Sequence, residues 1–221
     1  RPERKFKFRN PQNVVKILVD NAKDDLCILD VSFSSVWWRI LNPVLEQNDD
    51  INEIRIIVSI QKIVSTYGMH PLDRLEGYRL NIERINESFS RDKSVTIMVT
   101  KELTNMKNET NYHDRFVISQ KNIWNFPPSD SIVKGDRSDI HLLKNQDTID
   151  SDLERFERLW NDEKSYKITG KKNAEFKKAA DDVAQRYEKS NEEKLRSMRK
   201  LEDNDTPSKL KEILDSEKKQ E

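Results

Sequence analysis

The sequence predicts an α/β fold in which a mixed, mostly parallel sheet is flanked by helices. Short and nearly continuous apolar runs, such as Leu26–Val31 and Ile54–Ile60, are typical of strands that are buried on both faces. Segments with helical spacing alternate with these runs over residues 1–163, as expected for parallel strands joined by helices. The composition then changes, because 29 of the 58 residues from Lys164 onward are charged. We therefore expect an α/β domain over residues 1–163 and a charged helical arm or tail over residues 164–221.

Helices are predicted at four places in the domain. Each has apolar residues at intervals of three and four, which give a helix one buried face. Asn10 and Pro11 are typical of an N-cap followed by a first-turn proline, and Pro71 opens the third helix in a similar way. The four helices are expected over residues 11–23, from Ser34 to about Leu45, over residues 71–89 and over residues 153–160.

The second of these helices carries two marked features. Pro43 is expected to break or kink it, because proline cannot donate a backbone hydrogen bond. Trp37 and Trp38 are adjacent, and adjacent helical residues point about 100° apart. We therefore expect one tryptophan in the core and the other at a contact surface or a dimer interface.

Four further strands and a long helix complete the predicted elements. After Lys164, apolar residues recur at intervals near three and four, with an interruption at Asn191 and a short helix after Pro207. Two interpretations stay open for this segment: a helix that packs on the domain or frays in solvent, and a coiled-coil or partner-binding arm. The strands are expected over residues 95–99, 115–119, 123–126 and 140–143.

Composition excludes several classes of function. The 40 basic and 40 acidic residues balance, so bulk charge indicates neither a nucleic-acid coat nor an acidic tail. Four scattered glycines exclude a Walker loop and a dinucleotide fingerprint, and a single cysteine, Cys27, excludes an intrachain disulfide and paired-cysteine zinc sites. No apolar run approaches the roughly 18 residues of a membrane span. We expect an intracellular protein, cytoplasmic or nuclear, without a metal or cofactor, and the start without Met favours a fragment or processed piece.

One polar pattern has a defined structural place. His113, Asp114 and Arg115 lead directly into the apolar strand Phe116–Ser119, so His113 and Arg115 share one face of the strand start. An imidazole can attack phosphorus or transfer a proton, and a planar guanidinium can hold two phosphate oxygens. The pattern indicates a phosphate site. The alternative is a histidine that is hydrogen-bonded at a strand edge and an arginine paired with a carboxylate.

This motif and the elements that follow it resemble one half of the phospholipase D-like superfamily. The resemblance is carried by His113–Phe116, by a hairpin with Trp124 and Phe126, and by Phe156–Trp160, and it covers residues 10–162. Within this superfamily, the sequence is most similar to the bacterial-type subset, which carries a His-Asp-Arg-Phe form of the family's His-x-Lys motif. In that family two motif copies face each other, and one histidine attacks phosphorus while the other protonates the leaving group. One copy here implies a homodimer, and any activity would be a metal-independent phosphodiesterase or nuclease with a phosphohistidine intermediate.

The resemblance also assigns residues, and several depart from the family's pattern. Loss of the family's aspartate removes the group that orients the imidazole. Two prolines in place of Gly-Ser cannot donate backbone hydrogen bonds and stiffen the loop. We therefore expect catalysis to be weakened or lost, with a phosphate pocket retained. The assigned positions are His113 for the nucleophile, Arg115 for the phosphate-binding lysine, Gln120 for the aspartate, Pro127–Pro128 for Gly-Ser, Asp130 for the asparagine, and Ser129 for a hydroxyl if the loop slips by one residue.

Other basic residues are weaker candidates. Arg74, Arg79 and Arg84 give the third helix a basic edge, but acidic residues are interleaved with them. The edge is either a solvated mixed face or a contact for a nucleic-acid backbone. His70 and His141 either line the same cleft or are structural histidines.

Two functions remain in view. The first is a phospholipase D-like domain that engages a phosphodiester or another phosphate-bearing ligand, with nucleic acid expected because the similar His-Asp-Arg-Phe proteins look nuclease-related. The second is a non-catalytic interaction module. It would bind a protein partner through residues 164–221, or an acidic phospholipid headgroup, as the resemblance to membrane-remodelling proteins with a degenerate domain of this fold implies.

Overall fold

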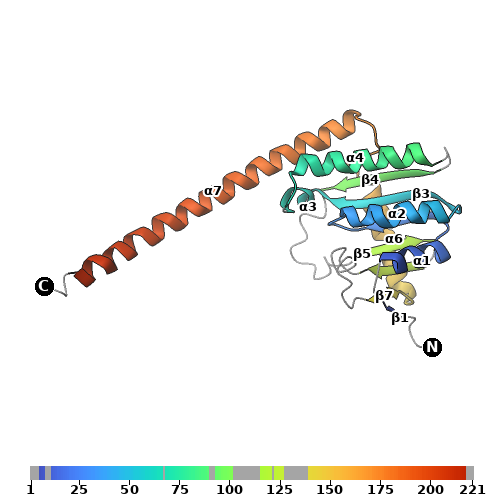
Figure 1. The fold of residues 1–221 in the computed structure, drawn as a ribbon, viewed down its shortest axis with the longest axis horizontal. Helices are drawn as coiled ribbons and strands as arrows, with labels where there is room; N and C mark the ends of the chain where they lie inside the picture. The colour runs from blue at the N-terminus through green and yellow to red at the C-terminus, as the bar shows by residue number, and fades with distance from the viewer. Residues whose placement is uncertain are drawn as a thin grey trace.

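A computed structural model describes residues 5–7, 11–66, 68–89, 93–101, 115–120, 122–126 and 139–217. In these ranges the chain forms an eight-stranded sheet in the order β1-β7-β6-β5-β2-β3-β4-β8, with helices on both faces (Figure 1). The strands are β1 Lys5–Lys7, β2 Asp24–Leu29, β3 Ile51–Ser59, β4 Ser94–Thr100, β5 Arg115–Ser119, β6 Asn122–Phe126, β7 Asp139–Leu142 and β8 Tyr166–Ile168. The helices are α1 Pro11–Asn21, α2 Ser35–Gln47, α3 Ile60–Ser65, α4 Pro71–Ser88, α6 Gln146–Trp160 and α7 Ala174–Glu217.

The α/β class is confirmed, but parallel pairing is narrower than predicted. Only β2, β3 and β4 are parallel among the described strands, and every other pairing is antiparallel. The connections explain this difference. Helical crossovers join β2 to β3 and β3 to β4, as parallel strands require, whereas the short connection between β5 and β6 permits only an antiparallel hairpin.

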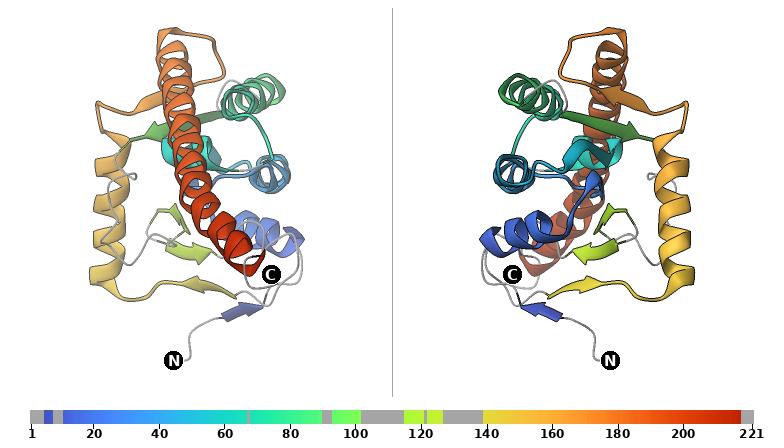
Figure 2. Two further views of the ribbon diagram at one scale, coloured as in Figure 1. Left: turned by 90° about the vertical axis from the view of Figure 1, so that its left-hand side faces the viewer. Right: turned by 90° about the vertical axis from the view of Figure 1, so that its right-hand side faces the viewer.

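The alternating side chains of the strands separate two cores. Leu26 and Ile28 of β2 join the larger core, where α1, α2, α4 and the first turns of α7 pack. Cys27 and Leu29 point the other way, toward α6 and its buried Phe156. Figure 2 shows α6 on one side of the sheet and α1, α2 and α4 on the other.

The sheet and the larger core continue past residue 163, where the sequence places the end of the domain. β8 pairs with the edge of β4, and Phe176, Ala179 and Val183 of α7 are buried. Farther along, α7 projects from the body (Figure 1), and its Leu195 and Met198 side chains are 55% and 59% exposed. The first turns of the predicted arm thus belong to the packed fold.

Two expectations about helix ends and breaks were wrong. The long helix predicted after Lys164 is present as α7, but it is continuous from Ala174 to Glu217, without a separate helix after Pro207. Pro43 does not break α2, because buried neighbours on both sides of it hold the helix on the sheet. One proline removes a single backbone hydrogen bond, which such packing outweighs.

Trp37 and Trp38 are both buried, at 1% and 7% exposure, so the expectation of one surface tryptophan was also wrong. Phe33, which precedes the helix, covers both rings. It stacks on Trp37 with centroids 6.1 Å apart and meets Trp38 edge-on at 5.1 Å. Trp37 also contacts Phe126 of β6 at 5.5 Å. The two faces of α2 are therefore covered by different neighbours.

Candidate functional site

The carboxyl ends of the three parallel strands bring buried polar residues to one edge of the sheet. Asp30 follows β2, Ser59 ends β3 and Thr100 ends β4, and all three are at most 2% exposed. The antiparallel β5 begins at the same edge, and the pairing of Leu29 with Phe116 places Arg115 opposite Asp30. The chain winds from β2 toward β3 and β4, while β5 lies on the other side of β2. Ligands of open α/β sheets bind at such a switch in strand order.

Asp30 is the centre of this edge. Its side chain is fully buried. Oδ1 accepts hydrogen bonds from Arg115 Nε at 2.8 Å and from the Ser32 backbone amide at 3.0 Å, and Oδ2 accepts one from Trp37 Nε1 at 2.7 Å. A buried carboxylate is costly unless it is paired and hydrogen-bonded, and these three donors meet that need.

The hydrogen bonds of the described residues satisfy only part of the Arg115 guanidinium. The side chain is 12% exposed and its Nε is held by Asp30. Nη1 is buried and has no hydrogen-bond partner within the ranges that the structure describes. Buried polar atoms nearly always have a partner, so this N–H group is available to a ligand oxygen. The carboxylate partner agrees with the alternative that the sequence left open for Arg115, and it leaves part of the guanidinium for an anion.

Three of the other predicted catalytic residues lie outside the described residues: His113, Ser129 and Asp130. The motif residue Asp114 and the prolines Pro127–Pro128 lie outside them too. Gln120 is described, and it lies away from Arg115. It follows the opposite end of β5, about 16 Å away at 3.3 Å per residue, and its Nε2 donates to Asp24 at 2.8 Å. The structure therefore places Gln120 at the opposite end of β5 from Arg115 and Asp30, and its weak catalytic assignment stays a prediction.

The three arginines of α4 differ in their surroundings. Arg79 is only 6% exposed and donates to Glu76, Glu83 and the Gly170 carbonyl, so it offers no free guanidinium to nucleic acid. The hydrogen bond with Glu76 raises the pKa of Arg79 and lowers that of the glutamate. Arg74 is half-buried and donates to the Thr66 carbonyl at 3.4 Å, and Arg84 is exposed.

The two described histidines have structural contacts. His70 caps α4, where its Nδ1 accepts a hydrogen bond from the Leu72 amide at 3.3 Å. Its ring meets Tyr187 of α7 edge-on at 4.9 Å. His141 is half-buried in β7, opposite Asn125 of β6. Neither is paired with Arg115 or Asp30 in these contacts.

A second ionic cluster fixes α7 beside the carboxyl end of β4. Asp182 accepts hydrogen bonds from Tyr166 at 3.0 Å and Arg186 at 2.8 Å, and it pairs with Lys101 at 2.9 Å. Burial alone would raise the pKa of Asp182, but hydrogen bonds from Lys101, Arg186 and Tyr166 outweigh burial and lower it. Hydrogen bonds with Tyr166 and Asp182 raise the pKa of Lys101. The cluster is an anchor for the helix.

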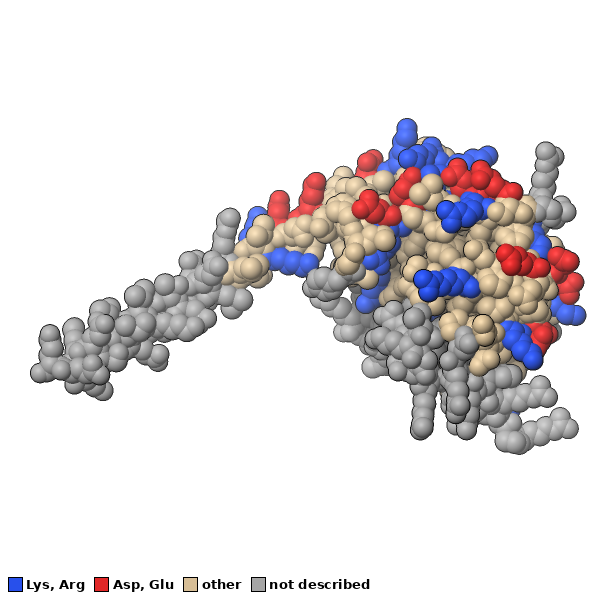
Figure 3. Space-filling model, viewed as in Figure 1, with Lys and Arg blue, Asp and Glu red and all other residues tan. Residues whose placement is uncertain are grey.

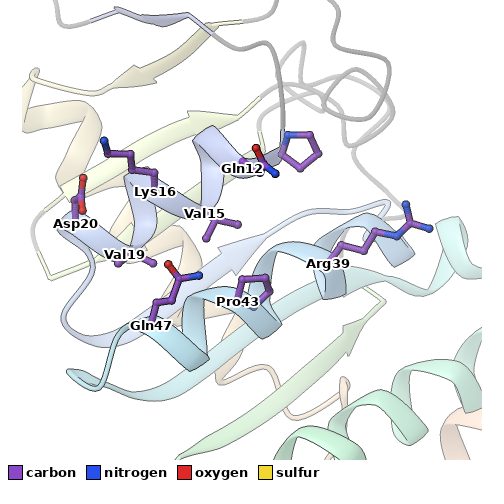
Figure 4. A pocket seen from close by; sticks show the side chains of 9 residues that line it. Gln12, Val15, Lys16, Val19, Asp20, Arg39, Pro43 and Gln47 are labelled. Atoms are coloured by element: carbon purple, nitrogen blue, oxygen red, sulfur yellow. The ribbon is translucent and has the colours of Figure 1, made fainter.

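A groove of about 600 Å³ lies between α1 and α2 (Figure 4). Its floor is apolar, with Val15, Val19 and Pro43, and polar side chains such as Lys16 and Arg39 stand at its rim. None of the buried unpaired polar atoms of the described side chains belongs to its lining. The lining of this groove therefore shows no unsatisfied buried donor or acceptor that would bind a particular ligand.

The described residues contain no cluster of three or more histidine, cysteine, aspartate or glutamate side chains that could hold a metal ion. Within the same ranges, no helix combines the length and the apolar character that crossing a membrane requires.

No protein-family model matches the chain, and no curated protein matches it. Several solved structures show a weak likeness to this chain, two of which are as follows. One is TrmBL2, an archaeal chromatin protein described with a novel mode of DNA binding: 12% identity, TM-score 0.40, covering 72% of this chain and 52% of that one. The other is phosphatidylserine synthase from Haemophilus influenzae Rd KW20: 13% identity, TM-score 0.42, covering 85% of this chain and 43% of that one. The chain spans about half the length of these proteins.

The loop beside the site depends on a buried tyrosine, which gives a pH prediction. Tyr78 of α4 donates its hydroxyl to the Phe33 carbonyl at 2.6 Å, and burial raises the pKa of Tyr78 above its ordinary value. Stability that is present below the unfolded pKa of about 10 is therefore lost as the pH rises toward the higher folded pKa. Tyr78→Phe is expected to cost about 1 kcal/mol at neutral pH and to make the alkaline decline shallower. Urea unfolding of both proteins across the alkaline range measures the difference.

Cys27, whose pKa burial also raises, is present in both proteins and cancels in that comparison. Parallel stability profiles for the parent and Tyr78→Phe would contradict the assignment of the alkaline decline to Tyr78.

Proposed function

We propose that Asp30 and Arg115, at the carboxyl ends of the parallel strands, form a site (the carboxyl-end site) that binds a phosphate group of nucleic acid, and that phosphodiesterase chemistry there is weakened or lost. Arg115 is the phosphate ligand in this proposal. The observation that carries it is the buried Arg115 Nη1, which has no partner among the described residues while Asp30 holds Nε of the same side chain. An arginine that is fixed on one edge and unsatisfied on another is suited to hold an oxyanion.

Asp30 supports this role in two ways. Its hydrogen bond from Nε fixes the guanidinium plane, so less side-chain freedom is lost when a phosphate binds. Its charge balances that of Arg115, so the guanidinium is not an unpaired buried cation. Binding then depends on hydrogen-bond geometry more than on net charge.

The surface favours a local phosphate contact over a broad electrostatic one. In the view of Figure 3, basic and acidic side chains are interspersed over the body of the protein. A protein that neutralises many phosphates loses affinity steeply with added salt, whereas one that neutralises one or two loses it slowly. We therefore expect modest affinity with a shallow dependence on salt concentration.

Oligonucleotide binding tests the proposal. Arg115→Gln is expected to weaken binding of a fluorescent single-stranded DNA about tenfold or more, since a hydrogen bond to a charged group contributes about 1.5–3 kcal/mol. Arg196→Gln is the matched control, because it removes the same charge from an exposed position on α7, and its effect is expected to stay within about twofold. Fluorescence anisotropy at two salt concentrations measures both variants.

A second variant separates binding from folding. Arg115→Lys keeps a cation beside Asp30 but loses the planar fork, so it should fold and still bind several-fold more weakly than the parent. Equal binding by the parent, Arg115→Lys and Arg115→Gln, with thermal unfolding checked for each, would overturn the proposal. Rapid DNA cleavage in the presence of a chelator, abolished by His113→Ala, would instead show an intact catalytic centre.

Partner binding through α7 is a second candidate function. The exposed Leu195 and Met198 on the projecting part of this helix favour it, because apolar side chains on a helix surface are typical of helix–helix contacts. Sedimentation equilibrium of the full chain and of a chain ending at residue 190 tests self-association. A dimer that becomes a monomer on truncation assigns the contact to α7, and a dimer that persists assigns it to the packed fold.

A further inference from the structure

A second pocket lies at the carboxyl edge of the sheet, on the side of Asp30 that faces α4. It has a volume of about 360 Å³ and opens between the start of α2 and the first turns of α4. Neither Asp30 nor Arg115 lines this pocket, so it is separate from the carboxyl-end site. The residues that line it are Phe33, Ser34, Ser35, Trp38, Gly68, Met69, Arg74, Gly77, Tyr78 and Asn81.

The charge of this pocket is positive. Arg74 alone carries a charge among the described lining residues, and none of them is acidic. Its Nε is buried and has no hydrogen-bond partner in the part of the chain that the structure describes, while Nη2 makes only a long contact of 3.4 Å to the Thr66 carbonyl. A buried N–H group without a partner in a pocket is a donor that a ligand can satisfy. The chemistry on this side favours an anion.

The rest of the pocket is apolar or uncharged. Phe33, Trp38 and Tyr78 form an aromatic cluster, in which Phe33 meets Trp38 at 5.1 Å and Tyr78 at 5.8 Å. Met69 adds a 55% exposed side chain at the lining. Pockets for small molecules typically combine such apolar walls with a few placed polar groups.

We propose that this pocket binds a small organic anion, with the anionic group on Arg74 and a compact apolar or aromatic body against Phe33, Trp38 and Tyr78. Arg74 would bind the anionic group of such a ligand, and the aromatic cluster would contact its apolar body. Electrostatic attraction and the unsatisfied Arg74 Nε fix its orientation, and burial of the apolar body supplies most of the affinity.

Gly77 gives a way to close the pocket without harming the fold. A Cβ atom built on this residue meets nothing within 4 Å. Gly77 lies inside α4, where alanine and leucine are better helix formers than glycine. Gly77→Leu is therefore expected to fill the pocket in a folded protein, and Gly77→Ala is the matched control that adds one methyl group.

Anilinonaphthalene sulfonate, a fluorescent aromatic anion, is a suitable probe for the full chain. We expect saturable binding of one dye per chain, weakened at least about tenfold by Gly77→Leu and by Arg74→Gln, and changed less than about threefold by Gly77→Ala. N-phenylnaphthylamine, an uncharged relative of the dye, should respond to Gly77→Leu but not to Arg74→Gln. Dye binding that Gly77→Leu leaves unchanged would overturn the proposal, and so would equal responses of the two dyes to Arg74→Gln.

Competition identifies the source of the anion. Displacement of the dye by adenosine monophosphate assigns the pocket to a nucleotide, and displacement by benzoate alone assigns it to an aryl acid. Failure of both to displace the dye would overturn the assignment to natural organic anions. Because Gly77→Leu and Arg74→Gln leave Asp30 and Arg115 intact, loss of dye binding and loss of oligonucleotide binding can be told apart.

Discussion

Asp30→Ala is expected to lower the free energy of unfolding by about 3–5 kcal/mol, the range for breaking a buried ion pair by removing one partner. Asp30 is fully buried and accepts hydrogen bonds from Arg115, Trp37 and the Ser32 amide. Its removal leaves the Arg115 guanidinium mostly buried without its counter-charge and the Trp37 Nε1–H without an acceptor. Urea unfolding followed by tryptophan fluorescence measures the loss.

Asp49→Ala is the matched control for this prediction. The Asp49 side chain is fully exposed, at 101%, and its contact with Lys93 is long, at 3.5 Å, so its loss should leave the free energy of unfolding nearly unchanged. Asp30→Asn keeps an oxygen acceptor and should fall between the two. An effect of Asp30→Ala within about 1 kcal/mol of the control would show that the pair is not essential to this edge of the sheet.

Ending the chain after residue 163 is expected to abolish cooperative unfolding, whereas ending it after residue 190 should change stability by less than about 1 kcal/mol. The shorter piece lacks β8, which covers the edge of β4, and it lacks the buried Phe176, Ala179 and Val183. Burying each large apolar side chain contributes about 1.5–3 kcal/mol, and a domain of this kind has only about 5–15 kcal/mol in total. Thermal unfolding followed by circular dichroism tests both pieces.

A pair of point variants gives the same test without truncation. Val183→Asp places a charge in the core and is expected to cost at least about 3 kcal/mol. Leu195→Asp introduces the same group on the same helix at a position that is 55% exposed, and it should cost less than about 1 kcal/mol. A stable, cooperatively folded chain of residues 1–163 would contradict the packing described for α7.

The sequence predicted the sheet and its helices where long apolar patterns exist, and it missed the short elements. α3 has six residues and directly follows β3, so its apolar residues extend a strand pattern instead of forming one of their own. β8 has three residues, Tyr166–Ile168, and too few positions to show alternation. Both elements are set by tertiary packing against neighbours that a local pattern does not contain.

Only part of the candidate site could be predicted, because a local pattern does not contain contacts between distant segments. The position of Arg115 at a strand start follows from its local sequence, but its partner Asp30 lies 85 residues earlier and is set by the register of β2 with β5. A charged residue at the end of the apolar run of β2 was the available signal for Asp30. Arg79 is a residue for which the local pattern predicted the wrong environment. Its spacing from Glu76 and Glu83 predicts a solvated helix face, but Arg79 is buried against the distant Gly170, whose carbonyl accepts a hydrogen bond from it.

The anchoring of α7 at one end sets how the rest of the helix stands relative to the sheet. Phe176 and Val183 fix the first turns in the core, and Asp182 ties them to Lys101 and Tyr166. From Val183 to Glu217 the continuous helix extends about 50 Å at 1.5 Å per residue. Glu217 therefore lies about 50 Å along the helix axis from Val183, the last buried residue among the described side chains of α7, so the C-terminal end of the helix is far from the strand ends.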